Sequence, residues 1–444
     1  MTDTPSKPFV RDLGRIRELA ADIRTRRLTP AALLERCLDR IEAVDAEIQA
    51  WRQVDIARAK AEAQTLSREA QDGRFRGPLH GIPLGVKDVI DVGGLNTRCN
   101  SRSRADAPAA TADAEIVLQL RRQGMLVLGK LHTTEFAFFD PSPARNPHNP
   151  GHTPGGSSSG SGAAVAAGMV PAALGTQTVA SVNRPAAYCG IAAFKPSTRS
   201  TTMYGVAPLA PSYDTVGFYG YTVDDAVFLY EASAPPFFPG PPSPIDGGPE
   251  RFRIVLPIDP HLDAATDEAR GVWQSAADAL SKSGFDVASR RSSVSFEEIF
   301  ALQRSTMLYE MSRIYAPVRD LEPGLIGARF LAAVEDGSAI ATPRYVAERS
   351  RLDDLRASLL AANADADAFL WPAAPDTAPK GLDWTGDPRF ISPWTLIGGP
   401  VVTVPVACAA NGLPLACILA GHPGSDRKQC TLARRVADVI ERRI

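Results

Sequence analysis

The chain contains a serine-rich segment and a later isolated serine whose residue types could support nucleophilic catalysis. The stretch "HTPGGSSSGSGAAVAAG" (152–168) sets several serines among glycines, and "GTQTVASVNRPAAYCG" (175–190) places Ser181 among small residues. A serine hydroxyl is a weak nucleophile until a nearby base removes its proton. Because residues 175–190 contain no histidine, aspartate or glutamate, the base for Ser181 must come from another part of the chain.

Lys87 is a candidate for that base, since "GIPLGVKDVI" (81–90) surrounds it with apolar residues. A lysine can accept a proton at neutral pH only when burial lowers its pKa. A serine lying between this lysine and the nucleophile could accept one proton and pass on another in a single step. A lysine in an apolar strand also commonly snorkels or pairs with an acid, and Asp88 is its neighbour.

Two other motifs fit catalytic patterns only in part. "GMLVLGKL" (124–131) matches the opening of a phosphate-binding loop, but Leu131 stands where a magnesium-binding Ser or Thr is required. "GSSSG" (156–160) matches a nucleophile elbow centred on Ser158. That elbow follows a buried strand, which the preceding "RNPHNPGHTP" cannot form, and the two histidines further along the chain lie in loop-like surroundings. The first motif is better interpreted as a strand and a turn, and the serines of the second as turn formers and helix caps.

The sequence gives no support for a metal or a cofactor. His148 and His152 have a spacing that suits two ligands on one helix, but Pro150 and Gly151 between them exclude the helix. The cysteines are scattered without a C-x-x-C pair and are expected to be reduced thiols: Cys37, Cys99, Cys189, Cys408, Cys417 and Cys430.

Composition limits the class of partner. The chain has 48 basic and 50 acidic residues and a net charge of −2. This balance does not predict the excess of basic residues that binds nucleic acid or a membrane surface. The first thirty residues are too charged for a signal peptide and no apolar run is long enough to span a bilayer. We therefore expect a cytoplasmic protein that acts on a small molecule. The oligomeric state is left open, a homodimer included.

Local patterns indicate alternating helices and strands. Thr29-Pro30 is typical of a helix start, and an apolar stripe follows it at Leu34, Cys37, Leu38 and Ile41. A polar, alanine-rich helix is expected to follow this one and to end at about residue 70. Residues 77–94 read as strand–turn–strand, and 113–130 as a helix ended by Gly124 and followed by a buried strand. This order is typical of an α/β layer fold.

Taken together, "GIPLGVKD", "GGSSSGSGAAVAAG" and "GTQTVASVNRPAAYCGIAAFKPS" resemble the amidase signature family. The likeness covers nearly the whole chain and is weakest between about 245 and 360. It implies one α/β domain over residues 1–444, with a large mixed β-sheet covered by helices on both faces. Residues 1–70 would form a peripheral helical layer, and the proline-rich stretch 234–250 would be a surface connection.

The resemblance also implies a Ser–Ser–Lys triad that hydrolyses an amide C–N bond through an acyl-enzyme, without metal or cofactor. Ser181 matches the nucleophile, Lys87 matches the base, and Ser157 matches the bridging serine, which the family holds by a cis peptide. The family's oxyanion hole consists of backbone N–H groups, which here belong to residues 178–181. The implied oxyanion and substrate-binding residues are Thr178, Val179, Ala180, Ser158 and Arg184.

The nucleophile segment departs from the family pattern at four positions. Gln177 and Asn183 replace an acid and an arginine, so a buried ion pair would be exchanged for two amides that can still hydrogen-bond. Val179 and Ala180 replace two glycines, and Val179 would be strained if its position required a positive φ. This leaves open a catalytically impaired family member that acts as a binding protein.

Two further alternatives stay open. Pro185 favours an extended Arg184, whose guanidinium could then hold a substrate carboxylate in the cleft or could pair with Asp88 or Glu135. The chain could also be the glutaminase subunit of a transfer-RNA-dependent amidotransferase, a role that requires partner subunits.

Overall fold

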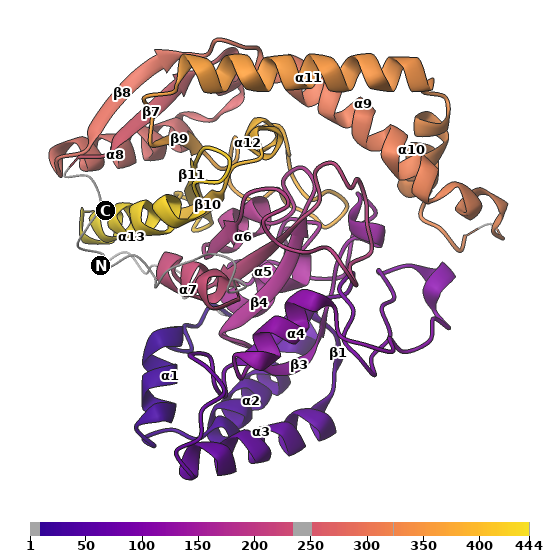
Figure 1. Ribbon diagram of the computed structural model, residues 1–444, viewed down its shortest axis with the longest axis vertical. Helices are drawn as coiled ribbons and strands as arrows, with labels where there is room; N and C mark the ends of the chain where they lie inside the picture. Colours follow the sequence, from indigo (N-terminus) through magenta and orange to yellow (C-terminus); the bar gives the residue numbers. More distant parts are fainter. Residues whose placement is uncertain (1–8, 234–250, 323, 444) are drawn as a thin grey trace.

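The computed structural model describes residues 9–233, 251–322 and 324–443, and the predicted connection 234–250 lies outside them. One mixed sheet runs through these residues, in the strand order β1-β3-β2-β4-β6-β5-β10-β11-β9-β7-β8 (Figure 1). The strands are β1 (Trp51–Val54), β2 (Pro83–Lys87), β3 (Leu126–Leu131), β4 (Ala172–Gln177), β5 (Ala192–Lys195), β6 (Thr215–Gly220), β7 (Arg253–Ile258), β8 (Asp286–Arg291), β9 (Ala368–Pro372), β10 (Val401–Cys408) and β11 (Pro414–Ala420).

Both faces of the sheet are buried, because successive side chains of its inner strands belong to two different cores. In β4, Ala172 and Leu174 pack into one core while Ala173 packs into the other. The first core is completed by helices α1 (Ile16–Arg24), α4 (Glu115–Arg122), α7 (Val223–Ser233), α8 (Asp267–Lys282) and α13 (Asp426–Arg443). The second core is completed by helices α2 (Pro30–Ile48), α3 (Ile56–Gln71), α5 (Ser159–Ala166) and α6 (Asn183–Cys189). The predicted fold class is therefore confirmed.

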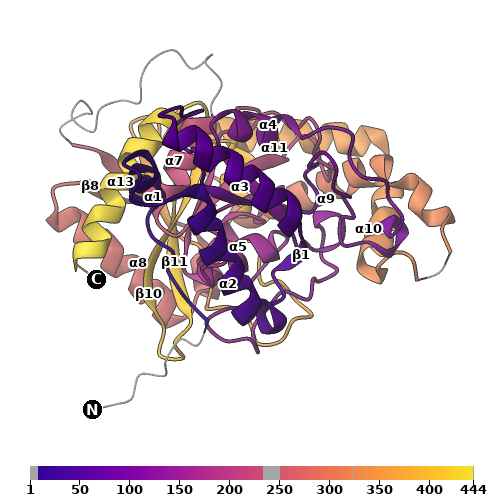
Figure 2. The ribbon, with the colours of Figure 1, turned by 90° about the horizontal axis from the view of Figure 1, so that it is seen from below.

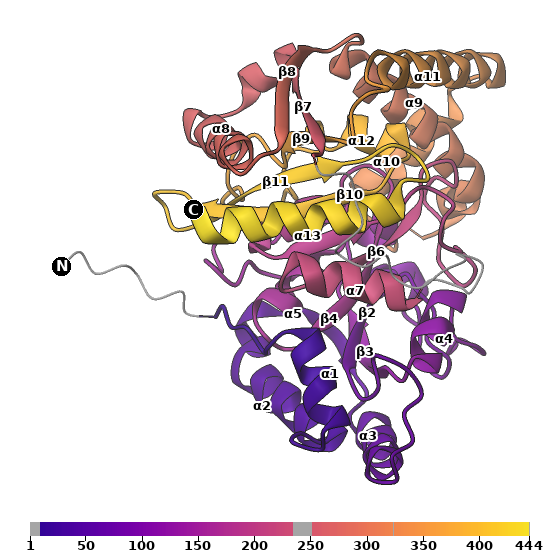
Figure 3. The same cartoon turned by 60° about the vertical axis from the view of Figure 1, so that its left-hand side comes forward.

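The N-terminal helices form as the sequence indicates. Thr29 caps α2 by accepting a hydrogen bond from the Ala32 N–H at 3.1 Å, with Pro30 in the first turn. One strand lies among the helices of the peripheral layer expected over 1–70. Strand β1 separates α2 from α3 and pairs with β3 at the edge of the sheet. Figures 2 and 3 show α2 and α3 lying against this end of the sheet.

The centre of the sheet positions the residues singled out for chemistry. Strands β2 and β4 are parallel neighbours, with Val86 opposite Leu174, so Lys87 at the end of β2 lies beside the end of β4. The chain turns directly after Lys87, and the second strand predicted within 77–94 does not form. Gly129 and Lys130 of the apparent phosphate-binding motif lie inside β3 and form no loop.

Small residues let α5 approach the sheet edge closely. A Cβ on Gly160 would collide with the carbonyl oxygen of Ala50 and the backbone nitrogen of His132. The remaining helices are α9 (Phe296–Ile314), α10 (Ala328–Ser338), α11 (Thr342–Ala362) and α12 (Ser392–Ile397). Figure 1 shows α9, α10 and α11 packed as a group of helices at the upper right of the view, at the end of the molecule that also contains β7, β8 and β9. Among the described helices, none has the length and apolarity needed to cross a membrane.

Candidate active site

Lys87 is fully buried, and its ammonium nitrogen makes its closest contacts with two hydroxyl groups. Nζ lies 2.7 Å from Ser157 Oγ and 2.8 Å from Thr176 Oγ1. The alternative pairing with Asp88 does not occur, because Asp88 binds the buried Lys130 at 3.0 Å. In the part of the chain that the structure describes, no carboxylate lies within ion-pair distance of Lys87.

Burial lowers the pKa of Lys87 to about 7, and the negative charge of Asp214 opposes this shift. Removing an ammonium from water penalises its charged form, so a lysine without a carboxylate partner loses its proton more easily. A substantial fraction of Lys87 is therefore an uncharged amine near neutral pH. The group can act there as a base toward the hydroxyl of Ser157.

The backbone around Ser157 is held by hydrogen bonds to the carbonyl oxygen before it and to its own carbonyl oxygen. The Gly156–Ser157 peptide bond is cis. The carbonyl oxygen of Gly156 accepts a hydrogen bond from Arg184 Nη2 at 2.7 Å, and that of Ser157 accepts one from the Thr134 N–H at 3.1 Å. These contacts fix the hydroxyl of Ser157 beside Lys87.

Ser181 lies in the turn that joins β4 to α6 and is partly exposed, unlike Lys87 and Ser157. The Ser158 N–H donates to the Ser181 carbonyl oxygen at 3.3 Å, so the backbone after Ser157 adjoins the turn that carries Ser181. The structure thus brings Lys87 and Ser157 into direct contact, and it places the backbone of Ser181 against that of Ser158, the residue after Ser157.

The residues that replace glycine before Ser181 adopt ordinary backbone conformations. Neither Val179 nor Ala180 has a positive φ, so the strain considered for Val179 does not arise. Within the described residues, the N–H groups of Val179, Ala180 and Ser181 donate to no other group. Three consecutive free donors beside a serine hydroxyl are suited to binding an oxyanion.

Gln177 and Asn183 are both buried and hydrogen-bond to each other, with Gln177 Nε2 2.9 Å from Asn183 Oδ1. Gln177 Oε1 accepts the N–H groups of Val182 and Asn183 at 2.8 and 3.0 Å. This amide pair therefore caps the N-terminus of α6 with neutral groups.

Arg184 does not adopt the expected extended conformation, because it lies in the first turn of α6. Proline is tolerated in that turn, where a missing N–H removes no helical hydrogen bond, so Pro185 does not prevent the helix. The guanidinium is buried and donates to the carbonyl oxygen of Gly386 at 2.6 Å, to that of Gly156 at 2.7 Å and to Thr385 Oγ1 at 3.0 Å.

Neither Asp88 nor Glu135 is therefore the partner of Arg184. Burial lowers the pKa of Arg184 to about 10, which still leaves it charged at neutral pH. Ser158 is also buried, and its hydroxyl donates to the Thr176 carbonyl oxygen at 3.2 Å. These contacts favour structural roles for Arg184 and Ser158 over substrate binding.

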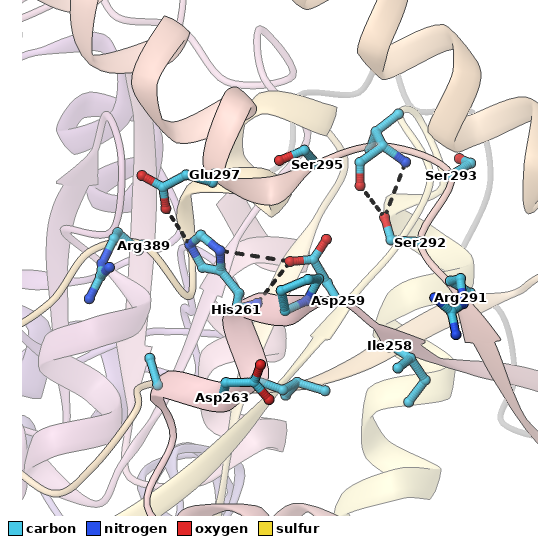
Figure 4. Close-up of a pocket in the computed structure, with 14 residues that line it drawn as sticks. Ile258, Asp259, His261, Asp263, Arg291, Ser292, Ser293, Ser295, Glu297 and Arg389 are labelled. Atoms are coloured by element: carbon cyan, nitrogen blue, oxygen red, sulfur yellow. Dashed lines mark hydrogen bonds and ion pairs between the residues drawn. The ribbon is translucent and has the colours of Figure 1, made fainter.

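A separate cavity of about 860 Å³ lies at the start of α9 and is not lined by Lys87, Ser157 or Ser181 (Figure 4). His261 faces Asp259 and Glu297 there, each 3.7 Å from a ring nitrogen. The hydroxyl groups of Ser292 and Ser295 bond to backbone groups instead of to His261. No Ser-His-Asp arrangement is assembled in this cavity.

Three residues in contact with the site were not singled out by the sequence analysis. Thr176 binds the ammonium of Lys87, and Thr395 binds the Val179 carbonyl oxygen at 2.5 Å. Thr176 lies inside a segment quoted for its likeness to the amidase signature family, and Thr395 lies outside the stretch in which that likeness is weakest. Gln303, which binds the Thr178 carbonyl oxygen at 3.3 Å, lies where the likeness is weakest, and no local pattern marks it.

The fold and the comparisons with known proteins define the class as hydrolases of amide C–N bonds. The family model "Amidase" matches residues 32–430. The chain belongs to the amidase family.

Individual relatives agree with this assignment. A solved structure of an amidase is 29% identical, covers 97% of this chain and 100% of its own, and superimposes with a TM-score of 0.85. The 2-amino-5-chloromuconic acid deaminase of Comamonas testosteroni is 28% identical over 95% of both chains. One component of the glutamyl-tRNA(Gln) amidotransferase of Lysinibacillus sphaericus (strain C3-41) is 35% identical over 224 residues, which cover 49% of this chain and 45% of that protein.

Proposed function

We propose that the chain hydrolyses a small carboxylic amide through an acyl-enzyme on Ser181, with Ser157 as proton relay and Lys87 as base. The observation that carries this proposal is the 2.7 Å contact between the buried Lys87 ammonium and Ser157 Oγ. It links a lysine with a lowered pKa to a hydroxyl beside the Ser181 turn. The absence of positive φ at Val179 and Ala180 supports this reading over an impaired binding protein.

In the acylation step, Ser181 Oγ forms a bond to the amide carbon. Its proton moves to Ser157, and the Ser157 proton moves to the uncharged Lys87 amine. The carbonyl oxygen becomes an oxyanion that the N–H groups of Val179, Ala180 and Ser181 stabilise. The C–N bond then breaks as the proton returns through Ser157 to the leaving nitrogen, which departs as ammonia or an amine.

Deacylation repeats this path with water as the nucleophile. Water attacks the ester carbon while its proton passes through Ser157 to Lys87. Ser181 then leaves and regains a proton from the same relay. The products are a carboxylic acid and the enzyme in its starting protonation state.

A fluorophosphonate probe tests this assignment directly. We expect the intact protein to be labelled at Ser181, the Ser181→Ala variant to remain unlabelled, and Ser157→Ala and Lys87→Ala to react far more slowly. Ser161→Ala is the matched control, since this buried serine only donates to the Leu174 carbonyl oxygen. Mass spectrometry that found the label on another serine, with Ser181 unmodified, would refute the proposal.

The similarity to an amidotransferase component makes a glutaminase role the second candidate. A component of that kind depends on partner chains, whereas a free-standing amidase does not. Assaying the purified chain alone against glutamine and against a panel of simple amides separates the two. Turnover of simple amides by the isolated chain favours the amidase.

A further inference from the structure

Two side chains from distant parts of the chain hold consecutive carbonyl groups in the turn before Ser181. Gln303 of α9 donates from Nε2 to the Thr178 carbonyl oxygen at 3.3 Å. Thr395 of α12 donates from Oγ1 to the Val179 carbonyl oxygen at 2.5 Å. The next carbonyl, that of Ala180, accepts the Arg184 N–H within the same turn and helix.

Planarity of the peptide group converts these contacts into a direction for the N–H groups. In a trans peptide, the C=O of one residue and the N–H of the next point in opposite directions. A Thr178 carbonyl directed toward Gln303 therefore turns the Val179 N–H away from α9. A Val179 carbonyl directed toward Thr395 turns the Ala180 N–H away from α12.

Both side chains are fixed at their other ends, so they hold the carbonyls in one orientation. Gln303 Oε1 accepts the hydroxyl of Ser392, which belongs to the same short helix as Thr395. Thr395 Oγ1 accepts from Gln177 Nε2 at 2.9 Å. Gln303 and Thr395 are buried, and every partner in this arrangement is neutral.

We propose that Gln303 and Thr395 are positioning residues that direct the N–H groups of Val179 and Ala180 toward the oxyanion of the substrate. This inference rests on the proposed function, because it assigns a purpose to those N–H groups. It also explains how a turn without glycine can present consecutive donors. Loss of one oxyanion donor typically lowers kcat by about 10²–10³-fold. Misdirecting one donor should therefore cost about 10–100-fold.

The test compares Thr395→Val and Gln303→Met with the intact protein in kcat, KM and affinity for an alkyl trifluoromethyl ketone. This ketone forms an adduct on the nucleophilic serine that carries an oxyanion, so its affinity reports on the N–H donors. We expect kcat and ketone affinity to fall together by about 10–100-fold while KM changes little. Thr395→Ser keeps the hydroxyl and should restore most of both values.

Ser312→Ala is the matched control on α9, because that buried hydroxyl bonds only to the Tyr309 carbonyl oxygen of its own helix. If Gln303→Met fails to fold, Ser392→Ala releases only the far end of Gln303 and should give a smaller loss in the same direction. Unchanged ketone affinity in Thr395→Val, with only a lower melting temperature, would overturn the inference. An intact protein that no fluorophosphonate labels would instead overturn the proposed function.

Discussion

Gln177 and Asn183 join the end of β4 to the start of α6 through a side-chain hydrogen bond of 2.9 Å between two buried neutral amides. The turn that contains Ser181 lies between them. The contact between these two ends is therefore neutral, and it should not change over the pH range in which Lys87 titrates.

Gln177→Glu tests this neutrality. A carboxylate at that position would be buried without a cation, which costs about 3–5 kcal/mol. We expect a lower free energy of unfolding at pH 7 in urea titrations, with partial recovery toward pH 5. Burial should raise the pKa of this carboxyl in the folded protein above its value in the unfolded chain. Its charge then lowers the free energy of unfolding at pH values above the unfolded pKa, and this effect disappears when the carboxyl is protonated. Gln53→Glu, on an exposed position of β1, should change little at either pH.

Lys87→Met should abolish activity and stabilise the protein. Lowering the lysine pKa from 10.5 to about 7 corresponds to roughly 4 kcal/mol of destabilisation at pH 7. The variant also loses the hydrogen bonds of Lys87 to Ser157 and Thr176, each of which contributes about 1 kcal/mol to stability. We therefore expect the free energy of unfolding to rise by about 2 kcal/mol. The cost of burying Lys87 is largest below pH 7 and disappears above its unfolded pKa, so the gain should shrink as the pH rises to 10. A variant less stable than the intact protein at pH 7 would contradict this account.

The pH dependence of kcat/KM should rise through one ionisation near pH 7, where Lys87 becomes an uncharged base. Asp214 raises the pKa of Lys87, so Asp214→Asn should move the midpoint to lower pH. Asp214 also accepts the Thr178 hydroxyl at 2.6 Å, and the maximal rate should therefore fall as well. The exposed control Asp72→Asn should leave the midpoint unchanged. A midpoint that moves to higher pH in Asp214→Asn would disprove the assigned base.

Arg184→Met should reduce kcat for acidic and neutral amides alike. The substitution leaves the Gly156 and Gly386 carbonyl oxygens without their donor, and a buried unsatisfied group costs about 1–3 kcal/mol. The melting temperature should fall with the activity. A rise in KM confined to acidic amides, with stability unchanged, would instead show that Arg184 binds a substrate carboxylate.

Gly160→Ala should destabilise the protein by about 1–3 kcal/mol through overpacking against Ala50 and His132. Gly271→Ala is the matched control, because a Cβ there meets nothing within 4 Å and α8 gains a better helix former. We expect the two substitutions to have opposite signs in thermal unfolding. Equal changes in melting temperature would show that α5 can move away from Ala50 and His132 at little cost in stability.

Local sequence rules predict the parts of this fold that depend on neighbouring residues. The Thr29-Pro30 helix start and the apolar surroundings of Lys87 are each encoded within a few residues. Arg184 shows the limit of such rules. Pro185 alone favours an extended predecessor, but the amide cap supplied by Gln177 places both residues in a helix.

Contacts between distant segments could not be predicted in this way. Strand β1 is short and lies between two helices, so only its pairing with β3 identifies it. Gln303 is one polar residue in a helix of mixed composition, and nothing nearby indicates that its amide reaches Thr178. The direction of backbone groups in the Ser181 turn is likewise a property of the assembled fold.

The hydrogen bonds from Gln177 to Thr395 and from Asn183 to Thr403 connect residues 218 and 220 positions apart. During synthesis, the Ser181 turn emerges long before α12 and β10, which must support it. At translation rates of about 5–20 residues per second, the interval is roughly 10–40 s. A nascent chain should therefore remain unable to attack amides until the ribosome has nearly finished it, and hydrolytic activity should appear abruptly with the last strands.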